Sequence, residues 1–358
     1  MNLADLGWNP GWEQAFAPMA ATGLQPARVV TEDKHHYTVV SVDGPAIAQI
    51  AGKFFRQRGN PASLPKVGDW VGLRPNPASD RLAIEALLPR RSAITRKNPG
   101  RAAAAQILAA NIDLALVVQS MDATLSLRRI ERFIVAVLEG HCRPVVVLNK
   151  CDLHSDPDAV ARDVRQVAGE HPIVLTSART GRGLGLLRGL LAPCTTAVVL
   201  GTSGVGKSSL VNRLLGEKAM VTLPVRDSDS KGRHATTHRE LVLLPDGSLV
   251  IDTPGLREMH LWLAGGSLEE AFPDVAEIAP QCRFRDCRHD ADNGCAVRAS
   301  VAEGRLPGPR LASFLKLQAE LEDVARRKQE HEWDMNRRRA RGGNARVQWA
   351  RHGHDEDV

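Results

Sequence analysis

The sequence predicts a multi-domain protein in which a small β-barrel precedes an α/β domain and a segment with metal ligands follows both. Its 358 residues exceed the size at which a single hydrophobic core keeps growing. Short alternating apolar runs fill residues 27–97, whereas nearly continuous apolar runs, typical of buried parallel strands, appear after residue 110. Three cysteines and one histidine gather between Cys282 and Cys295. These observations favour several units over one large domain.

The composition is that of an ordinary globular protein, with 43% hydrophobic and 25% charged residues. No apolar run reaches the ~18 residues that span a bilayer, and the N-terminus lacks the basic start and apolar core of a secretory signal. We therefore expect a cytoplasmic protein without membrane contact. The net charge of +6 and the pI near 9.2 favour a polyanionic partner, although a solvated basic surface would give the same balance.

We interpret residues 1–26 as an N-terminal arm with one short helix and residues 27–97 as a barrel of five short strands. Turn signals such as Asp43-Gly44-Pro45 separate the apolar runs, which suits a closed barrel of the oligonucleotide-binding (OB) type. The expected strands are Arg28–Thr31, Tyr37–Val42, Ala46–Ile50, Asp69–Leu73 and Leu82–Leu88.

Basic side chains with interleaved aromatic residues make this barrel a candidate RNA-binding surface. Cations can contact the RNA backbone while aromatic rings stack on bases. The basic residues are Lys53, Arg56, Arg58, Arg74, Arg90, Arg91, Arg96 and Lys97, and the aromatic residues are Tyr37, Phe54 and Phe55. The alternative is that the rings belong to the barrel core and the charges are solvated.

A loop of the form G-x-x-x-x-G-K-S follows the apolar run Thr196–Leu200 and opens into the helix-like run Leu210–Leu215. Strand, glycine loop and helix in this order predict a nucleotide phosphate-binding loop, because glycines let backbone N–H groups and the helix N-terminus converge on a phosphate. Lys207 would add a catalytic cation, and Ser208 a hydroxyl for Mg²⁺. The expected phosphate-binding residues are Gly201, Thr202, Ser203, Gly204, Val205, Gly206, Lys207, Ser208 and Ser209. A glycine-rich turn without a ligand gives no reason for Lys207 and Ser208 at this spacing.

Two motifs earlier in the chain predict that the base is guanine. An apolar strand ends at Asn149-Lys150-Cys151-Asp152, an N-K-x-D sequence, in which the Asp152 carboxylate would accept from the ring N1–H and the exocyclic amine of guanine. Ser177-Ala178 would present a backbone N–H to the base carbonyl. Alone, the tetrapeptide is a common polar turn, but in a chain with a phosphate loop it indicates guanine recognition. The surrounding elements are expected to be strands over 111–120 and 144–148 and helices near 127–140 and 157–170.

Beyond the phosphate loop, Glu240–Leu244 and Leu249–Ile251 predict a hairpin that ends at Asp252-Thr253-Pro254-Gly255. This D-x-x-G sequence would place the Asp252 carboxylate near the nucleotide-bound Mg²⁺ and the Gly255 N–H near the γ-phosphate. The hairpin would therefore complete the phosphate end of the site.

The order of these motifs resembles that of a circularly permuted GTPase, because the guanine loops precede the phosphate loop, whereas a Ras-like GTPase has the phosphate loop first. The barrel, the segment Gly232-Arg-His-Ala-Thr-Thr237, the D-T-P-G sequence and the cysteine cluster together resemble the bacterial ribosome-small-subunit-dependent GTPase family, RsgA, over residues 27–325. The resemblance implies an N-terminal OB-type β-barrel, a central α/β P-loop GTPase with circularly permuted motif order, and a C-terminal zinc-binding domain with a helical, basic tail. The expected segments are an arm over 1–26, the barrel over 27–97, the GTPase domain over 98–262, the zinc domain over 263–325 and the tail over 326–358.

In the RsgA family, the polar loop before residue 239 corresponds to the first switch, whose threonine binds Mg²⁺ in the GTP state. The resemblance assigns this role to Thr236, with Thr237 as the alternative because the threonine run is interrupted here. Leu256 stands where a Ras-like GTPase has a water-orienting glutamine, and an apolar side chain cannot orient water. The resemblance assigns this catalytic role to His234, whose imidazole could position or deprotonate the attacking water. The alternative is a loop histidine that contacts RNA phosphate.

The pattern Cys282-x₄-Cys287-x-His289-x₅-Cys295 supplies the ligands of a tetrahedral Zn²⁺ site. Four protein ligands leave no open position, so we expect one structural zinc ion per chain. The alternative is a chance cluster of thiols. Neighbouring arginines would make this segment basic enough to contact RNA, and they are Arg283, Arg285, Arg288 and Arg298.

The C-terminal tail follows the helix-like run Arg310–Ala325 and is rich in arginine, as in Arg337-Arg-Arg-Ala-Arg-Gly-Gly343. Such composition predicts a segment that is disordered or that folds on RNA. The alternative is an extension that only improves solubility.

Together these features predict a GTPase that binds the small ribosomal subunit and its rRNA and whose hydrolysis of GTP controls its own release during late subunit assembly. Mg²⁺ would accompany GTP, and we expect a monomer. The alternative is an RNA-binding assembly scaffold for which guanine nucleotide is a structural ligand. Leu256 in the place of the glutamine favours the scaffold, whereas His234 favours the enzyme.

Overall fold

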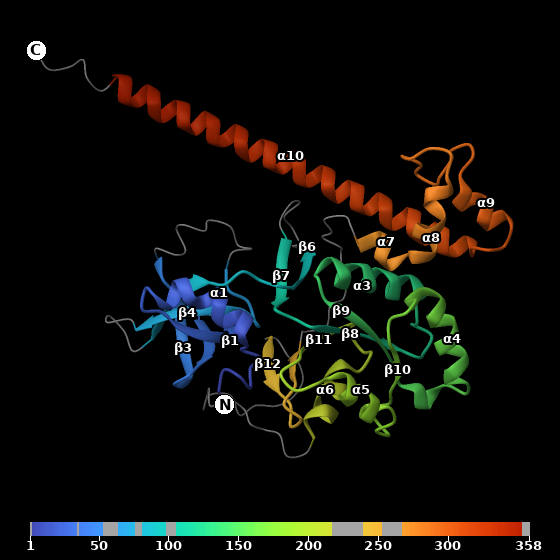
Figure 1. Cartoon of the computed structure of the whole chain (residues 1–358), viewed down its shortest axis with the longest axis horizontal. Coiled ribbons are helices and arrows are strands. Elements are labelled where there is room, and N and C mark those ends of the chain that lie inside the picture. The colour runs from blue at the N-terminus through green and yellow to red at the C-terminus, as the bar shows by residue number, and fades with distance from the viewer. Residues whose placement is uncertain are drawn as a thin grey trace, which may run out of the picture.

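The computed structural model describes residues 2–33, 36–52, 64–75, 81–97, 105–216, 239–252 and 267–352. In Figure 1 the first strands (blue) lie beside the α/β region (green to yellow), and the last helices (orange to red) lie along one side of that region. Within these ranges, no helix combines the length and the apolar character that crossing a membrane requires.

The five expected N-terminal strands form a closed barrel. They are β1 (Gln25–Asp33), β2 (His36–Ser41), β3 (Gly44–Ile50), β4 (Trp70–Pro75) and β5 (Leu82–Leu87). Neighbouring strands pair in the order β1-β2-β3-β5-β4, and β4 pairs again with β1, where Arg28 lies opposite Trp70. Because closure leaves no long unpaired edge, the barrel is the stable solution for five short strands. The prediction of an OB-type barrel is confirmed.

The barrel interior corrects part of the predicted RNA surface. The Tyr37 side chain is buried with Val29, Val39 and Val71 in the barrel core, and a buried ring offers no open face to a base. The stacking prediction is therefore wrong for Tyr37, and the core alternative holds for it. Arg90 already has a partner within the protein, because its guanidinium forms an ion pair with the buried Asp69 carboxylate at 2.7 Å. Among the other residues of that prediction, Lys53, Phe54, Phe55, Arg56 and Arg58 lie outside the described residues.

The N-terminal arm contains the expected short helix, α1 (Pro10–Ala20). Its N-cap, Asn9, accepts hydrogen bonds from the backbone N–H groups of Gly11 and Trp12, at 3.1 and 3.2 Å, which satisfies donors that a helix start leaves free. Trp12 is buried, and the ring of Trp8 meets that of Trp70 edge-on at 4.8 Å. The arm is therefore held on the barrel by aromatic packing.

The α/β domain is a sheet covered on both faces. Its five parallel strands lie in the order β10 (Ile173–Leu175), β9 (Arg143–Asn149), β8 (Leu114–Ser120), β11 (Thr196–Leu200) and β13 (Leu249–Asp252), and β12 (Glu240–Leu243) pairs antiparallel with β13. One face packs on α3 (Leu127–Glu139) and α4 (Pro157–Ala168), and the other on α5 (Leu184–Leu190) and α6 (Lys207–Leu215). Burial on both faces explains the nearly continuous apolar strands. The carboxyl ends of the parallel strands meet at one edge, where open α/β sheets bind their ligands.

A hairpin that the sequence did not lead us to expect connects barrel and sheet. Strand β6 (Ala93–Lys97) pairs antiparallel with β7 (Ala105–Ala110). Alanine favours helices over strands, so the composition of β7 hides its conformation. Burial of its last three residues, Leu108, Ala109 and Ala110, shows that tertiary packing decides instead. The expected domain boundary between residues 97 and 98 falls between these paired strands, and the division into domains stays a prediction.

The barrel and the sheet also share a strand pair and one buried arginine. Strand β1 pairs with β12, so the two units form a single run of paired strands. Burial lowers the pKa of Arg28 to about 10, and hydrogen bonds offset the cost of burying its charge. Its acceptors are the carbonyls of Leu6, Gly68 (3.3 Å) and Asn111 (3.1 Å) and the hydroxyl of Thr196 (2.9 Å).

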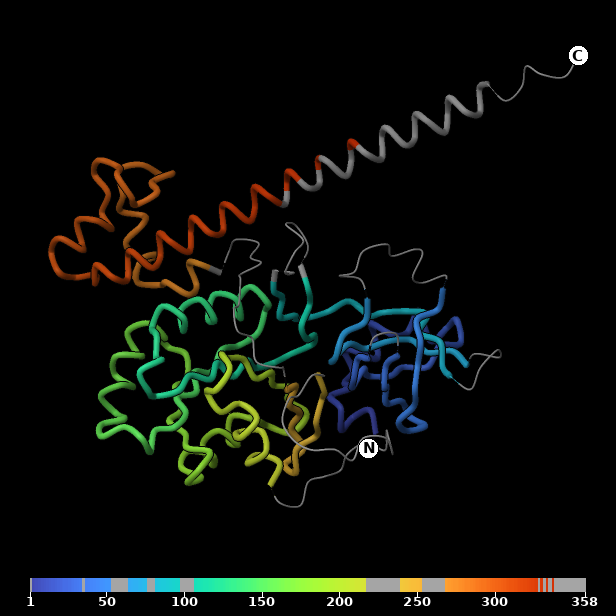
Figure 2. The backbone as a smooth tube through the Cα atoms, turned by 180° about the vertical axis from the view of Figure 1, so that it is seen from behind, coloured from blue at the N-terminus to red at the C-terminus, as the bar shows by residue number. Residues whose placement is uncertain are grey.

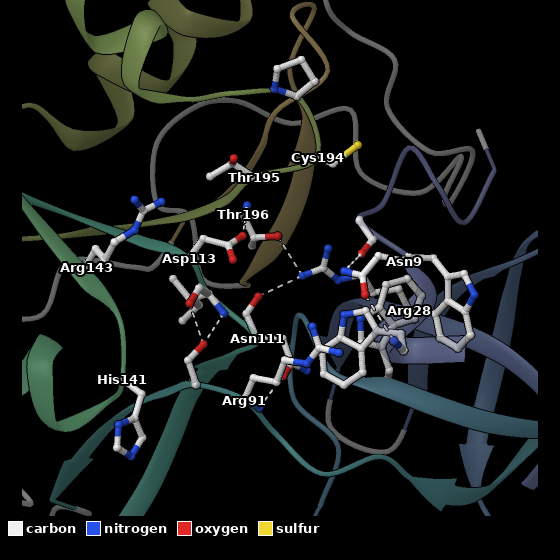
Figure 3. Close-up of a pocket in the computed structure, with 17 residues that line it drawn as sticks. Asn9, Arg28, Arg91, Asn111, Asp113, His141, Arg143, Cys194, Thr195 and Thr196 are labelled. Carbon is white, nitrogen blue, oxygen red and sulfur yellow. Dashed lines mark hydrogen bonds between the residues drawn. The ribbon is translucent and has the colours of Figure 1, made fainter. Parts of the chain in front are cut away.

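A cavity of about 570 Å³ lies beside this arginine (Figure 3). Asn9 of the arm, Arg28 of the barrel and Asp113 and Thr196 of the sheet all line it. Because Thr196 is the first residue of β11, the cavity lies at the opposite end of that strand from the phosphate loop.

The C-terminal unit is helical. It consists of α7 (Ser267–Ala271), α8 (Pro273–Ile278), a 3₁₀ turn (Ala279–Gln281), α9 (Ala296–Ala302) and α10 (Gly308–His352). Figure 2 shows the first part of α10 (red) beside the other helices of this unit (orange). Residues 326–352 continue α10, which agrees with the expected helical, basic tail and not with a disordered one. Arginine, glutamate and lysine are good helix formers, and no proline interrupts this segment.

A buried group of charges joins α10 to the α/β domain. The Arg310 guanidinium donates to the Glu131 carboxylate of α3 at 2.7 Å and to both carboxylate oxygens of Asp274 of α8, at 2.9 and 3.1 Å. The Ser313 hydroxyl donates to the second oxygen of Glu131. The side chains of Arg310 and Glu131 are only 5% and 3% exposed. Each charge has hydrogen-bonding partners, which offsets the desolvation cost and fixes the C-terminal unit on α3.

Candidate nucleotide site and candidate metal site

The glycine-rich loop lies at the carboxyl end of β11 and leads directly into α6. Gly206 has φ +94°, and a Cβ atom there would lie 2.3 Å from the Asn149 side-chain nitrogen. A Cβ atom on Gly201 would lie 2.4 Å from the Val118 carbonyl oxygen. Glycine is therefore required where the loop passes its neighbours. Since α6 begins at Lys207 without a side-chain cap, its N-terminus is open to an anion.

The Lys207 side chain folds back over this loop. Its Nζ donates to the carbonyl oxygens of Gly201 at 3.0 Å and Thr202 at 2.9 Å, and the residue is 6% exposed. Burial lowers the pKa of Lys207, while the Asp252 carboxylate opposes that shift. Asp252 ends β13 and pairs in register with Val199 of β11. The structure thus brings Lys207 and Asp252 to the same end of the sheet.

One buried side chain, Asn149, connects three of the expected nucleotide loops. Its amide nitrogen donates to the carbonyl of Val205 in the glycine-rich loop at 2.8 Å. Its amide oxygen accepts from the backbone N–H of Ala178 at 3.2 Å and from the Thr176 hydroxyl at 3.3 Å. Because buried polar groups are costly without partners, these bonds hold the loops together. Motifs far apart in the sequence therefore form one site.

Asp152 lies in a single 3₁₀ turn, Cys151–Leu153, directly after β9. Lys150, the residue before this turn, has φ +63°, a conformation that is uncommon outside glycine. Hydrogen bonds from Ser177 and then Arg179 lower the pKa of Asp152. The carboxylate is thus kept in the ionised form that accepts hydrogen bonds only.

The sequence interpretation missed Asp122, which lies beyond the end of β8 next to Lys150. The Lys150 ammonium and the Asp122 carboxylate are 3.3 Å apart. Hydrogen bonds, first from the Ser120 hydroxyl and then from Thr124, lower the pKa of Asp122. Its position two residues past a buried parallel strand was the available signal, since that edge is where ligands bind.

The remaining nucleotide-site predictions concern residues outside the described ranges. These are His234, Thr236, Thr237, Gly255 and Leu256. Their roles stay predictions. Ser208 and Ser209, by contrast, lie exposed in the first turn of α6.

The four expected metal ligands come together in the C-terminal unit. One ligand atom from each of Cys282, Cys287, His289 and Cys295 lies within 4.8 Å of the others. The His289 Nδ1 atom is 3.5 Å from the sulfur of Cys282 and 3.5 Å from that of Cys295. Burial lowers the pKa of His289, which favours the neutral imidazole that binds metals. This cluster can hold a metal ion with four protein ligands.

Residues 87–262, which contain both guanine motifs and the glycine-rich loop, match the model of a family described as RsgA GTPase. A protein of Opitutus terrae named small ribosomal subunit biogenesis GTPase RsgA is 44% identical over 336 residues, which cover 91% of this chain and 92% of that protein. The chain belongs to the RsgA GTPase family. The family prediction made from the motif order is confirmed.

Solved structures agree with the permuted fold of the RsgA family. YjeQ from Thermotoga maritima aligns with a TM-score of 0.61 and 28% identity, covering 83% of this chain and 98% of that one. YloQ, described as a circularly permuted GTPase, aligns with a TM-score of 0.59 and 22% identity, covering 84% of this chain and 96% of that one. At that lower identity the likeness to YloQ concerns the fold alone.

Proposed function

We propose that this protein binds GTP and hydrolyses it on the small ribosomal subunit, and that hydrolysis triggers its own release during late subunit assembly. The observation that carries this proposal is the Asn149 side chain, which hydrogen-bonds the glycine-rich loop and the second guanine loop at once. Such a link makes base and phosphate recognition parts of one site. The name of the Opitutus terrae relative, a small ribosomal subunit biogenesis GTPase, supports the choice of partner.

We propose a role in nucleotide binding for each of the expected site residues. Asp152 reads the guanine edge, and Asn149 and Lys150 hold the base loop. Ser177-Ala178 face the base carbonyl, which would take the Ala178 N–H from the Asn149 amide oxygen. Residues 201–209 surround the phosphates, with the Lys207 ammonium stabilising charge on the transferring phosphoryl group. When bound with GTP, Mg²⁺ would neutralise phosphate charge. Ser208 and Thr236 would hold this ion, Asp252 would lie near it, and Gly255 would meet the γ-phosphate.

We assign activation of the attacking water to His234, because the apolar Leu256 follows Gly255. An imidazole can orient or deprotonate water near neutral pH. Binding to the subunit would bring the imidazole of His234 into position beside the attacking water, so that hydrolysis is fast only in the complex.

We further propose that the protein acts as a monomer in the cytoplasm and that its basic surfaces contact rRNA. Exposed cations of the metal-site segment, such as Arg285 and Arg298, are suited to phosphate contacts. The proposed division into units is the arm (1–26), barrel (27–97), GTPase domain (98–262), zinc domain (263–325) and tail (326–358).

The experiment that tests this function compares GTP turnover with and without purified small ribosomal subunits, in the wild type and in His234→Ala. We expect subunits to raise the turnover rate constant at least tenfold in the wild type. In His234→Ala the stimulated rate constant should fall by ~10²-fold or more, while GTP affinity stays nearly constant, because a positioning base acts on water and not on nucleotide binding.

The matched control is His141→Asn, which changes a histidine that lines the cavity at the far end of the sheet. Asparagine tolerates the positive φ of that position, so this variant should keep the stimulated rate. If subunits do not accelerate hydrolysis by the wild type, the protein acts as a scaffold. If His234→Ala stays within twofold of the wild type, another group activates the water.

We propose that Cys282, Cys287, His289 and Cys295 hold one structural zinc ion. Tetrahedral bonds of about 2.3 Å to sulfur and about 2.0 Å to nitrogen imply separations of about 3.8 Å between sulfurs and about 3.5 Å between sulfur and nitrogen. The Cys282 and Cys295 sulfurs are 3.9 Å apart, and the two sulfur–nitrogen distances are 3.5 Å, which supports this assignment.

Purified protein is therefore expected to contain one zinc ion per chain by elemental analysis, and Cys295→Ser should lose it. Chelation should unfold the segment around residues 282–295 but leave GDP affinity unchanged, since the nucleotide loops lie on the α/β sheet. The control is Cys194→Ser, which removes an exposed thiol outside the cluster and should retain full zinc. Wild-type protein without stoichiometric zinc would contradict the assignment.

A further inference from the structure

We propose that Arg179 is a positioning residue for guanine specificity, which holds the Asp152 carboxylate in its base-reading orientation, and that Arg213 anchors this device to the helix of the phosphate loop. The proposal rests on the proposed function, because it assumes that Asp152 reads the base. It adds two residues that the N-K-x-D and Ser-Ala motifs do not contain.

The first contact joins the two guanine loops directly. The Nε and Nη2 atoms of Arg179 both donate to Oδ2 of Asp152, at 3.0 and 2.7 Å. The Asp152 side chain is 11% exposed, whereas that of Arg179 is 73% exposed. The arginine therefore lies on the solvent side of the carboxylate and restricts its rotation from outside. Oδ1 accepts nothing from Arg179.

The second contact fixes the loop that carries Arg179. From α6, the Arg213 guanidinium donates to the carbonyl of Ala178 at 2.8 Å and to that of Arg179 at 3.0 Å. On its other side, Arg188 of α5 donates to the carbonyl of Arg213 at 3.0 Å. Helix α6 starts inside the glycine-rich loop. The helix that would bind phosphate therefore also fixes the position of the guanine loop.

The loop over residues 177–182 is held by hydrogen bonds within itself, so a contact at one point fixes the position of the whole loop. The Ser177 N–H donates to the Arg182 carbonyl at 3.0 Å, and the Gly181 N–H donates to the Ser177 carbonyl at 2.8 Å. The Thr180 N–H donates to the Ser177 hydroxyl at 3.1 Å. A loop with these internal bonds moves as a unit. The hydrogen bonds from Arg213 to the loop carbonyls therefore fix the backbone from which the Arg179 side chain extends.

Guanine recognition depends on the direction of the carboxylate, because its two oxygens must meet two parallel N–H donors. A carboxylate that is held in place loses less rotational freedom when the base binds, which improves affinity by preorganisation. An ion pair this exposed contributes little free energy by itself. The expected effect is therefore moderate and concentrated in discrimination between bases that differ at the Asp152-facing edge.

The test measures binding of GDP, inosine diphosphate and ADP to Arg179→Ala by titration calorimetry. Inosine lacks the exocyclic amine, so it makes one fewer bond to Asp152. We expect Arg179→Ala to weaken GDP by about threefold to tenfold, inosine diphosphate less than GDP, and ADP not at all. Arg179→Lys should recover part of the loss. Arg213→Ala should also reduce the preference for GDP over inosine diphosphate. The effects of Arg213→Ala and Arg179→Ala should not add in the double variant.

The matched control is Arg182→Ala, an exposed arginine of the same loop, which should stay within about 1.5-fold of the wild type for all three nucleotides. Asp152→Asn separates this inference from the proposed function. If Asp152→Asn leaves GDP affinity unchanged and does not improve xanthosine diphosphate, the guanine-loop assignment itself fails. If Asp152→Asn behaves as expected while Arg179→Ala binds GDP equally well or more tightly, the positioning role alone is overturned. An equal loss for all three nucleotides would also overturn it, because it would indicate general loosening of the site.

Discussion

Replacement of Lys207 by alanine is expected to lower single-turnover GTP hydrolysis by about 10³-fold, with and without small ribosomal subunits. Lys207 is 6% exposed, and its ammonium lies over the loop, where it donates to the carbonyls of Gly201 and Thr202. In the proposed role, this buried cation would stabilise the developing phosphoryl charge, and water could not easily replace it. Release of labelled phosphate at saturating GTP measures the loss. Ser208→Ala should also lose hydrolysis, through its proposed metal contact.

The matched control for Lys207 is Lys316→Ala, which removes an exposed lysine of α10 and should hydrolyse GTP at the wild-type rate. Both variants should keep the wild-type far-ultraviolet circular dichroism spectrum, since both positions lie in helices and alanine is a good helix former. Hydrolysis by Lys207→Ala near the wild-type rate would mean that residues 201–209 do not bind the phosphates.

Arg310→Met is expected to lower the free energy of unfolding by about 3–5 kcal/mol, as measured by urea denaturation. This substitution keeps the apolar stem but leaves the carboxylates of Glu131 and Asp274 without their cation. Glu131 is 3% exposed, so solvent cannot compensate its charge. The loss should appear as detachment of the C-terminal helices from α3.

The control pair lies on the same helix–helix contact. Arg132 of α3 and Glu320 of α10 are 3.0 Å apart but 32% and 33% exposed, so Arg132→Ala should cost only about 0–1 kcal/mol. Adding Glu131→Leu to Arg310→Met should recover much of the stability, because it removes the uncompensated buried carboxylate. Equal losses for Arg310→Met and Arg132→Ala would show that the buried cluster does not hold the interface.

The two sites differ in how much of their geometry the sequence specifies. The metal cluster needs only fourteen consecutive positions, from Cys282 to Cys295, so its spacing predicts the ligand set almost completely. The nucleotide site needs segments that are distant in the chain. Its motifs were recognisable because each sits between a buried strand and a helix, but nothing in them predicts that Asn149 bonds Val205, 56 positions later.

The errors of the sequence interpretation have physical causes. Alternation predicted the strand that contains Tyr37, but the barrel's closure decided which face points inward, and the ring is buried. Basic composition suggested a tail that is disordered or folds on RNA, although the same arginines and glutamates favour a helix once residues 308–325 have started one. Alanine-rich β7 gave no strand signal because its conformation comes from packing.

The sequence by itself determined the local chemistry of this protein: the glycine-rich loop, the guanine motifs and their permuted order, the metal ligands and the strands of the barrel. These depend on near neighbours and on the period of a strand or helix. Only the tertiary structure decided which distant groups meet. Arg28 reaches Thr196 across 168 positions, and Arg310 reaches Glu131 across 179. Such contacts leave no periodic trace in the sequence, because a buried charge is stabilised by whatever acceptors the completed fold brings to it.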